Sequence, residues 1–235
     1  MPRIPGLPDI EITLRRSAGS RRFSLRLSAL DGRVTLTMPA RAPLAEAHAF
    51  ARAQEDWLRR ALARRPERQH VAAGVLLPVE GQTLLVQVGP GRGVERLGDS
   101  LRVGGDPATL GPRLQAWLKT LARDRLARAS DRHAAALGRR ACSITLRDTR
   151  SRWGSCAANG RLMYSWRLVM APPAVLDYVA AHEVAHLVEM NHSGAFWAVV
   201  ERLSPGWKAQ RDWLKREGGA LHAWDFGGAT PALGD

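Results

Sequence analysis

The sequence predicts an α+β fold, in which a small sheet-containing part precedes a part built mainly from helices. Short segments that alternate between apolar and polar residues fill much of the first hundred positions. Longer apolar patterns with helical spacing fill most of the remainder, and Gly or Pro residues separate the segments. Because 235 residues suffice for two small domains, we expect a basic sheet-containing region at 1–105, a second domain at 106–222 and a flexible tail at 223–235.

The first part is expected to be a small antiparallel sheet followed by a helix. Apolar residues alternate along 10–16, 23–27 and 34–38, as they do in half-buried strands. Asp31-Gly32 lies between the last two segments and favours a hairpin turn. Residues 44–65 then carry apolar side chains at helical spacing, which predicts a helix.

Periodicity and the positions of Gly and Pro predict the later elements as well. They are expected to be a strand at 83–88, a hairpin near 97–103, a helix at 107–137, strands at 142–147 and 161–169 around a loop at 150–159, a helix from Pro172-Pro173 to about Met190, and a last helix at 193–216. The helix that begins at Pro172-Pro173 is apolar nearly all round, which predicts that it is buried.

Composition excludes several classes of protein. Two cysteines cannot build a disulfide framework. No apolar run approaches the roughly 18 residues of a membrane-spanning helix, and the first residues lack the apolar core of a secretory signal. We therefore expect a cytoplasmic protein that has no membrane partner.

The charge is strongly positive and uneven. The net charge is +13, from 35 basic and 22 acidic residues. Residues 1–140 hold 25 of the basic and 13 of the acidic residues, so nearly all of the excess lies there. Such an excess is typical either of a solvated Arg-rich surface or of an anionic partner such as a nucleotide or nucleic acid. The leading candidates for nucleic-acid contacts are Arg59, Arg60, Arg64 and Arg65.

Three polar residues interrupt the apolar stretch 175–190, VLDYVAAHEVAHLVEM. His182 and His186 are four positions apart, so both imidazoles project from one face of a helix. Neutral imidazoles at this spacing can chelate one zinc ion. Glu183 lies about 100° further round the helix, where its carboxylate can deprotonate a metal-bound water. This H-E-x-x-H arrangement is typical of zinc hydrolases.

A catalytic zinc ion needs a third protein ligand and one open position. Our first candidate is His192, which follows His186 by six residues, the spacing of the longer H-E-x-x-H-x-x-G-x-x-H pattern. Glu189 takes the place of the Gly in that pattern, so the turn toward the metal is expected at Met190-Asn191. Glu189 itself is expected either to hydrogen-bond a ligand His or to face solvent. The competing third ligands are carboxylates of the final helix, Glu201 and Asp212.

The stretch 147–215 resembles the YgjP-like metallopeptidase family, which is related to the SprT-like proteins. The matching segments are Arg152-Trp153-Gly154-Ser155-Cys156, Trp166-Arg167-Leu168, Ala171-Pro172-Pro173, Asp177-Tyr178-Val179, His182-Glu183-Val184-Ala185-His186-Leu187, Glu189-Met190-Asn191-His192-Ser193 and Phe196-Trp197. Their order and spacing agree with the family throughout. The N-terminal segments look like the start of the same family, so the resemblance covers nearly the whole chain and is loose before residue 107.

The resemblance implies a zinc-dependent hydrolase of a kind generally classed as a peptidase. It assigns one Zn²⁺ to His182, His186 and His192, and the general-base role to Glu183. Together with the motif, it makes residues 106–222 a zincin-like metallohydrolase domain, in which helices pack on a small antiparallel sheet and H-E-x-x-H lies on a buried helix. The substrate is left open.

Further residues near the motif are candidates for contacts with a substrate or a transition state. Arg152 lies in the loop between two strands, and Tyr164 and Tyr178 are further hydrogen-bond donors. An exposed strand edge there is expected to align a peptide by backbone pairing. The competing interpretation, which the residue types favour, is that each of these side chains has a packing or turn role. The aromatic residues of the last helix are expected to pack it against the metal helix; they are Trp197, Trp207 and Trp213.

The function that these observations favour is peptide hydrolysis, in which Glu183 takes a proton from zinc-bound water and the hydroxide attacks the carbonyl carbon. One alternative is a metal-dependent phosphohydrolase or pyrophosphatase that acts on nucleotides, since the same groups can activate water against phosphorus. Another is a SprT-like protease that associates with nucleic acid through its basic N-terminal region. The expected partners are accordingly a peptide or protein substrate and an anionic molecule.

Overall fold

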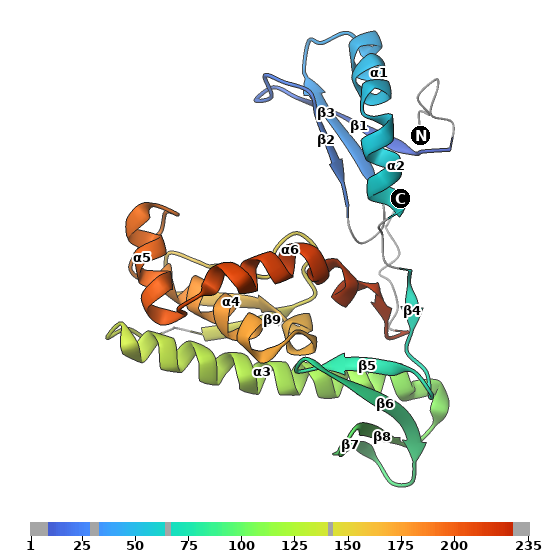
Figure 1. Cartoon of the computed structure of the whole chain (residues 1–235), viewed down its shortest axis with the longest axis vertical. Coiled ribbons are helices and arrows are strands. Elements are labelled where there is room, and N and C mark those ends of the chain that lie inside the picture. Colours follow the sequence, from blue (N-terminus) through green and yellow to red (C-terminus); the bar gives the residue numbers. More distant parts are fainter. Residues whose placement is uncertain (1–8, 29–32, 64–66, 141–142, 228–235) are drawn as a thin grey trace. The chain divides into compact units, whose positions relative to one another are not determined.

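The computed structural model of the chain describes residues 9–28, 33–63, 67–140 and 143–227. The chain forms two compact units, Met1–Glu67 and Arg68–Asp235. The fold mixes helices with several small sheets, as the α+β class requires (Figure 1). Among the described residues, no helix has both the length and the apolar character needed to cross a bilayer.

The first unit is a three-stranded sheet with two helices. Its elements are β1 (Ile12–Ser17), β2 (Ser24–Leu27), β3 (Val34–Pro39), α1 (Leu44–Ala53) and α2 (Glu55–Ala63). β3 is central, and it pairs with β2 in the antiparallel direction but with β1 in the parallel direction. The expectation of an antiparallel sheet is therefore wrong for β1. Alternation buries Ile12 and Leu36 whichever way the strands run, so it could not reveal the direction.

Two further expectations concern the same unit. The helix predicted over 44–65 is two helices that separate at Gln54. Asp31-Gly32, the predicted hairpin turn, lies outside the described residues, although Ser28 N donates to Arg33 O on either side of it at 2.9 Å. The buried core of the unit is formed by apolar residues of β1, β3, α1 and α2. They are Ile12, Val34, Leu36, Met38, Ala47, Ala51 and Leu58, with Ile10 beside them.

The second unit is built around one long helix. Its elements are β4 (Gln69–His70), β5 (Leu76–Val79), β6 (Gln82–Gly89), β7 (Gly93–Leu97), β8 (Ser100–Gly104), the 3-10 helix η1 (Pro107–Thr109), α3 (Leu110–Ala136), β9 (Ser143–Arg147), β10 (Gly154–Cys156), β11 (Arg161–Ser165), the 3-10 helix η2 (Trp166–Met170), α4 (Pro173–Ala185), α5 (Gly194–Leu203), α6 (Trp207–Ala223) and β12 (Trp224–Asp225). Figure 1 shows α3 running along this unit, in contact with α4 and β9 and, at one end, with the sheet that contains β7 and β8.

The boundary between the units lies before β4, whereas the sequence suggested a boundary near residue 105. The four-stranded sheet β5-β6-β8-β7 belongs to the second unit because its apolar face packs on α3. Leu84, Val86 and Leu101 of the sheet share one buried core with Leu114 and Leu118 of the helix. One face of such a sheet must be covered by another layer, and α3 is that layer.

A second sheet, in the order β10-β11-β9, lies next to α4. β10 is antiparallel to β11, and β9 is parallel to β11. The predicted loop at 150–159 therefore contains a strand, and the predicted strand at 161–169 ends at Ser165. The residues that follow, η2, are buried on all sides, so their apolar run carries no periodicity that distinguishes a strand from a helix.

The final helices also differ from expectation. α4 ends at Ala185, where it had been expected to continue to about Met190. The helix predicted over 193–216 is two helices, α5 and α6, separated at Pro205-Gly206, because Pro205 has no N–H to continue α5 and Gly206 is left-handed at φ 76°.

The segment after α6 is held in place as far as residue 227, although a flexible tail was expected from residue 223. β12 pairs with β4, and Phe226 is buried. The guanidinium of Arg167 donates to the carbonyl oxygens of Leu221 and Trp224 at 2.9 and 3.0 Å. Residues 228–235 lie outside the described part of the chain.

We expect Gly111→Ala to destabilise the protein by about 1–3 kcal/mol, the usual effect of overpacking. A Cβ at position 111 of α3 would lie 2.4 Å from the carbonyl oxygen of Phe226. Urea unfolding measures the change, and Gly194→Ala is the matched control, since a Cβ at that helical position meets nothing within 4 Å. Equal effects of the two substitutions would show that Phe226 does not pack on α3.

Candidate metal centre

α4 carries the first two histidines. Pro173 starts the helix, as Pro commonly does in a first turn, and the helix is buried on nearly all sides. His182 and Glu183 lie in its last turn, and His186 is the residue that ends it. Because the helix ends here, the chain is free to reverse direction immediately after His186.

The reversal brings three imidazoles together. Each of His182, His186 and His192 offers one ring nitrogen, and these atoms all lie within 4.8 Å of one another. The Nε2 atoms of His182 and His192 are 3.1 Å apart. His182 is half-buried, His186 is buried and His192 is exposed, so the cluster opens to solvent on the side of His192. The turn lies at residues 186–188, earlier than the predicted Met190-Asn191.

Glu189 supports this cluster through its backbone. The Nδ1 of His186 lies 2.9 Å from the carbonyl oxygen of Glu189. A carbonyl only accepts hydrogen bonds, so Nδ1 is the donor and Nε2 keeps its lone pair free for a ligand role. The sequence suggested that Glu189 acts through its side chain, but the contact belongs to the main chain.

The residues fit a zinc ion. Burial and the neighbouring imidazoles lower the pKa of His182 to about 4, and burial lowers the pKa of His186, so both rings are neutral near pH 7. Neutral imidazoles are the form that binds metals. Two ligands of a tetrahedral zinc ion with bonds of about 2.0–2.1 Å are separated by about 3.3 Å, which is close to the Nε2–Nε2 distance. The Nδ1 of His182 is buried without a hydrogen-bond partner in the described part of the chain.

Glu183 lies beside the imidazoles in an apolar setting. Burial raises the pKa of its carboxyl group to about 8, and the positive charge of Arg152 partly offsets this. Gly154 of β10 lies against it: a Cβ at that position would be 2.6 Å from both the Cγ and the Oε1 of Glu183. Only glycine therefore lets β10 approach the carboxylate this closely.

A pocket of about 430 Å³ opens beside Glu183 and His182. It lies within the second unit and is formed by β10, the residues before it, α4 and α6. Its lining residues are Arg152, Trp153, Gly154, Tyr178, Val179, His182, Glu183, Arg211, Leu214 and Lys215.

The structure separates the three predicted substrate contacts. Arg152 and Tyr178 line the pocket, and burial raises the pKa of Tyr178 to about 12. Tyr164 does not line it: the side chain is fully buried, and its hydroxyl is 2.9 Å from the hydroxyl of Ser130. Its role is in the core.

The two carboxylates considered as rival ligands have other contacts. Glu201 accepts from the N–H of Gly206 at 3.5 Å, and Asp212 lies 3.3 Å from the Nζ of Lys215. Neither belongs to the histidine cluster.

Sequence reasoning missed two cations of α6. Arg211 and Lys215 line the pocket, and the guanidinium of Arg211 lies 4.7 Å from the ring of Trp207. Trp207 stacks on Trp197 at 4.2 Å and on Tyr178 of α4 at 6.2 Å, and Trp197 lies 5.7 Å from the ring of His182, so these two tryptophans pack against the helix of the first two histidines as expected. Trp213 packs at the edge of the main core. The spacing of Trp207 and Arg211, four positions apart on one helix face, was the signal available in the sequence.

Trp153 fixes the start of β10. Its ring stacks on His222 at 4.9 Å, and a Cβ at Gly218 of α6 would lie 2.9 Å from it. Burial, reinforced by nearby Arg167, lowers the pKa of His222 to about 4. α6 therefore holds the segment that places Arg152 and Gly154 at the pocket.

We expect His222 to make the protein less stable as the pH falls from 6.5 to about 4. In this range the unfolded chain binds the proton that the folded chain excludes, because the pKa of His222 is lowered from 6.5 to about 4 on folding. His222→Phe keeps an aromatic ring beside Trp153 and removes the titration. Urea unfolding in the presence of a metal chelator measures the free energy of unfolding at each pH. Its pH dependence should be weaker in this variant than in the wild type, because the two proteins share all other histidines. Identical dependence in both proteins would contradict the burial of a neutral His222.

Three comparisons relate the chain to known proteins. The sequence model of a family described as "YgjP-like, metallopeptidase domain" matches residues 21–217. A search of curated proteins gives no match. Among solved structures, the chain is similar to the crystal structure of the metallopeptidase zymogen of Pyrococcus abyssi abylysin, with 24% sequence identity over 40% of this chain and 93% of that chain. The TM-score of 0.33 is too low to establish a shared fold.

Proposed function

We propose a zinc-dependent peptidase activity for this chain, which belongs to the YgjP-like metallopeptidase family. In the proposal, His182, His186 and His192 hold one Zn²⁺ and Glu183 is the general base. The observation that carries it is the convergence of three imidazole nitrogens beside one buried carboxylate at the wall of a pocket. A zincin-like architecture of the catalytic unit is part of the same proposal.

A zinc ion in such a site supplies a Lewis acid that polarises a carbonyl group and lowers the pKa of water. Glu183 takes up a proton from the attacking water at its carboxylate and returns it to the leaving amine. The positive charge of Arg152 favours the ionised carboxylate of Glu183 and so lowers its raised pKa. A lower pKa brings the carboxylate toward the range in which it can act as a base. The absence of a side chain at Gly154 leaves room for the carboxylate of Glu183 beside β10.

β10 is suited to hold a peptide. Among the residues that the structure describes, it pairs with β11 on one side only, so its other edge offers backbone N–H and C=O groups. Gly154 at its start lines the pocket. An extended peptide can add to such an edge by main-chain hydrogen bonds, which require no particular side chain. In this arrangement Arg152 and Tyr178 act on the scissile carbonyl or its neighbours.

We expect Glu183→Gln to retain zinc and to lose peptidase activity by a factor of about 10²–10⁴, the usual contribution of a general base. His192→Ala should lose most of its zinc, because two imidazoles remain. Metal analysis and cleavage of a peptide library measure the two effects. Glu189→Gln is the matched control and should change neither, because only the backbone of Glu189 contacts His186. Full activity in Glu183→Gln would refute the assignment.

A second candidate, hydrolysis of phosphate anhydrides or esters in nucleotides, is favoured by the charge of the pocket. Arg152, Arg211 and Lys215 line it, and Glu183 is its one acidic lining residue. Under this alternative, zinc-loaded protein releases phosphate from nucleoside triphosphates. We expect that Arg152→Ala then weakens this release at least tenfold, since Arg152 supplies a charge-assisted contact to the phosphate. Absence of any phosphate release would reject the alternative and leave the peptidase proposal intact.

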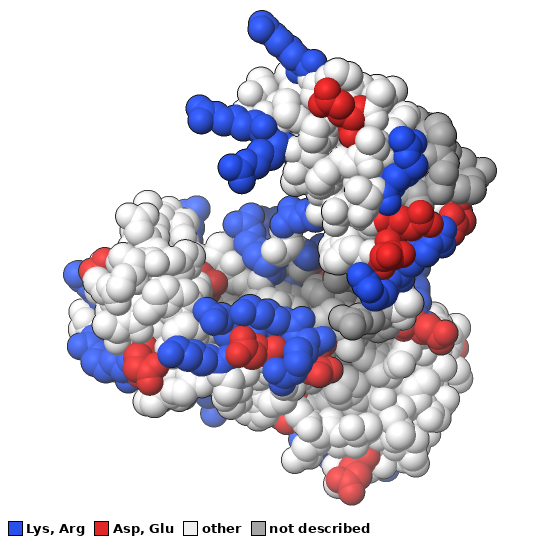
Figure 2. Space-filling model, turned by 45° about the horizontal axis from the view of Figure 1, so that its top comes forward, with Lys and Arg blue, Asp and Glu red and all other residues white. Residues whose placement is uncertain are grey.

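Association with nucleic acid through the first unit stays a prediction, as does a location in the cytoplasm. Arg59, one of the four arginines proposed for it, binds Asp9 at 2.6 Å and Glu55 at 2.9 Å, and Arg64 and Arg65 lie outside the described residues. Several other Arg side chains of the first unit project away from its acidic residues in Figure 2. Binding of an oligonucleotide that weakens steeply with salt would support the association.

A further inference from the structure

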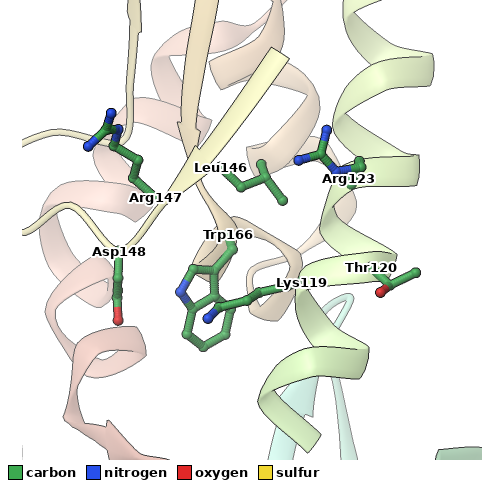
Figure 3. Close-up of a pocket in the computed structure, with 7 residues that line it drawn as sticks. All are labelled: Lys119, Thr120, Arg123, Leu146, Arg147, Asp148 and Trp166. Atoms are coloured by element: carbon green, nitrogen blue, oxygen red, sulfur yellow. The ribbon is translucent and has the colours of Figure 1, made fainter. Parts of the chain in front are cut away.

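A second pocket of about 430 Å³ lies on the catalytic unit, apart from the histidines. It is lined by Lys119, Thr120 and Arg123 of α3, by Leu146, Arg147 and Asp148 at the end of β9, and by Trp166 of η2 (Figure 3). None of these residues lines the pocket beside Glu183. β9 and β10 are the two edges of one sheet, so the two pockets adjoin opposite edges.

The only acidic residue of this pocket is already neutralised. Arg167 donates two hydrogen bonds to the carboxylate of Asp148, from Nε to Oδ1 at 2.7 Å and from Nη2 to Oδ2 at 3.0 Å. Arg167 is itself buried and held by backbone carbonyls, so this pair is a fixed part of the structure. Asp148 is therefore not available to balance the other charges of the pocket.

The three remaining charged residues are cations without a carboxylate partner among the described residues. The Nζ of Lys119 binds Gln115 Oε1 at 3.0 Å and lies 5.9 Å from the ring of Trp166. Arg123 donates to the carbonyl oxygen of Ile144 at 3.4 Å. Arg147 is exposed at the end of β9. Figure 3 shows Lys119 extending across the indole and Arg123 reaching from α3 toward β9.

The opposite face of α3 shows that this imbalance is local. Arg125, Arg128 and Arg132 lie there and also line a pocket. Each of them has a carboxylate partner: Glu80 at 2.6 Å, Asp124 at 2.9 Å and Asp177 respectively. One helix thus balances its cations on one side and leaves them unbalanced on the other. Lys119 and Arg123 are four positions apart, where like charges repel, so their placement carries a cost that a bound anion would remove.

The exposed hydrogen-bond donors of the pocket are its cationic side chains. Thr120 donates its hydroxyl hydrogen to the carbonyl oxygen of Ala116 at 3.2 Å, so its hydroxyl can only accept from a ligand. A phosphate group carries multiple negative charge and only acceptor atoms, and guanidinium groups match its geometry. The volume is in the range of pockets that hold small molecules, so it admits a phosphate with an organic group attached.

We propose that this pocket of α3, β9 and η2 binds a small phosphorylated molecule through its phosphate group, held by Lys119 and Arg123 of α3. The site is separate from the histidine cluster, and it does not depend on the proposed peptidase activity. A ligand bound there links α3 to the sheet whose other edge adjoins the catalytic pocket.

The test is calorimetric titration of the metal-free full chain with two probes, inorganic pyrophosphate and adenosine monophosphate. We expect saturable binding of at least one probe, weakened about tenfold or more in Lys119→Gln and in Arg123→Gln, because each loses a charge-assisted contact. Both side chains are exposed, and unchanged circular dichroism confirms folding. The matched control is Arg128→Gln, which removes a cation from the balanced face of α3 and should bind as the wild type does.

Three outcomes would overturn the proposal. The first is absence of saturable binding of either probe at millimolar concentration. The second is binding that survives Lys119→Gln and Arg123→Gln but is lost in the double variant Arg152→Ala, Lys215→Ala, which would assign it to the catalytic pocket. The third is much tighter binding of a single-stranded oligonucleotide with the same dependence on Lys119 and Arg123, which would make the surface a nucleic-acid site.

Discussion

The chain reversal after α4 is the constraint on which the rest of the catalytic unit depends. Two imidazoles four positions apart on a helix make only half of a metal site. The third, His192, joins them because α4 stops at Ala185 and the main chain of Glu189 comes back to His186. The same hydrogen bond that shapes this turn also sets which nitrogen of His186 faces the cluster. Backbone geometry and ligand chemistry are thus determined together.

The surrounding elements keep the environment apolar and the approach open. The rings of Tyr178, Phe196 and Trp197 pack around His182, and β10 lies against Glu183. Removal of both side chains from water is the largest cause of both pKa shifts. α6 holds Trp153 by its ring and so fixes the start of β10. Gly154 then brings a free strand edge against Glu183. The carboxylate of Glu183 is thus buried and yet lines a pocket through which a substrate can reach it.

Much of the site could be predicted from the sequence because helical spacing is a local property. His182, Glu183 and His186 follow from it directly, and His192 follows from its separation along the chain. Properties that depend on contacts between distant segments were not accessible. The parallel pairing of β1 with β3, the packing of β5–β8 on α3 and the burial of Tyr164 against Ser130 are of this kind. Arg211 was missed because a cation among tryptophans can face solvent, stack on an aromatic ring or line a pocket. Only the packing of α6 beside α4, which the sequence does not reveal, shows that it lines the pocket.

X-ray absorption at the zinc edge of the zinc-loaded protein tests the central claim most directly. The account predicts one zinc ion per chain with three imidazole ligands at about 2.0–2.1 Å, and two imidazole ligands on the zinc that His192→Ala still binds. Zinc that retains the same imidazole count in His192→Ala, or that is coordinated mainly by sulfur or carboxylate, would contradict it.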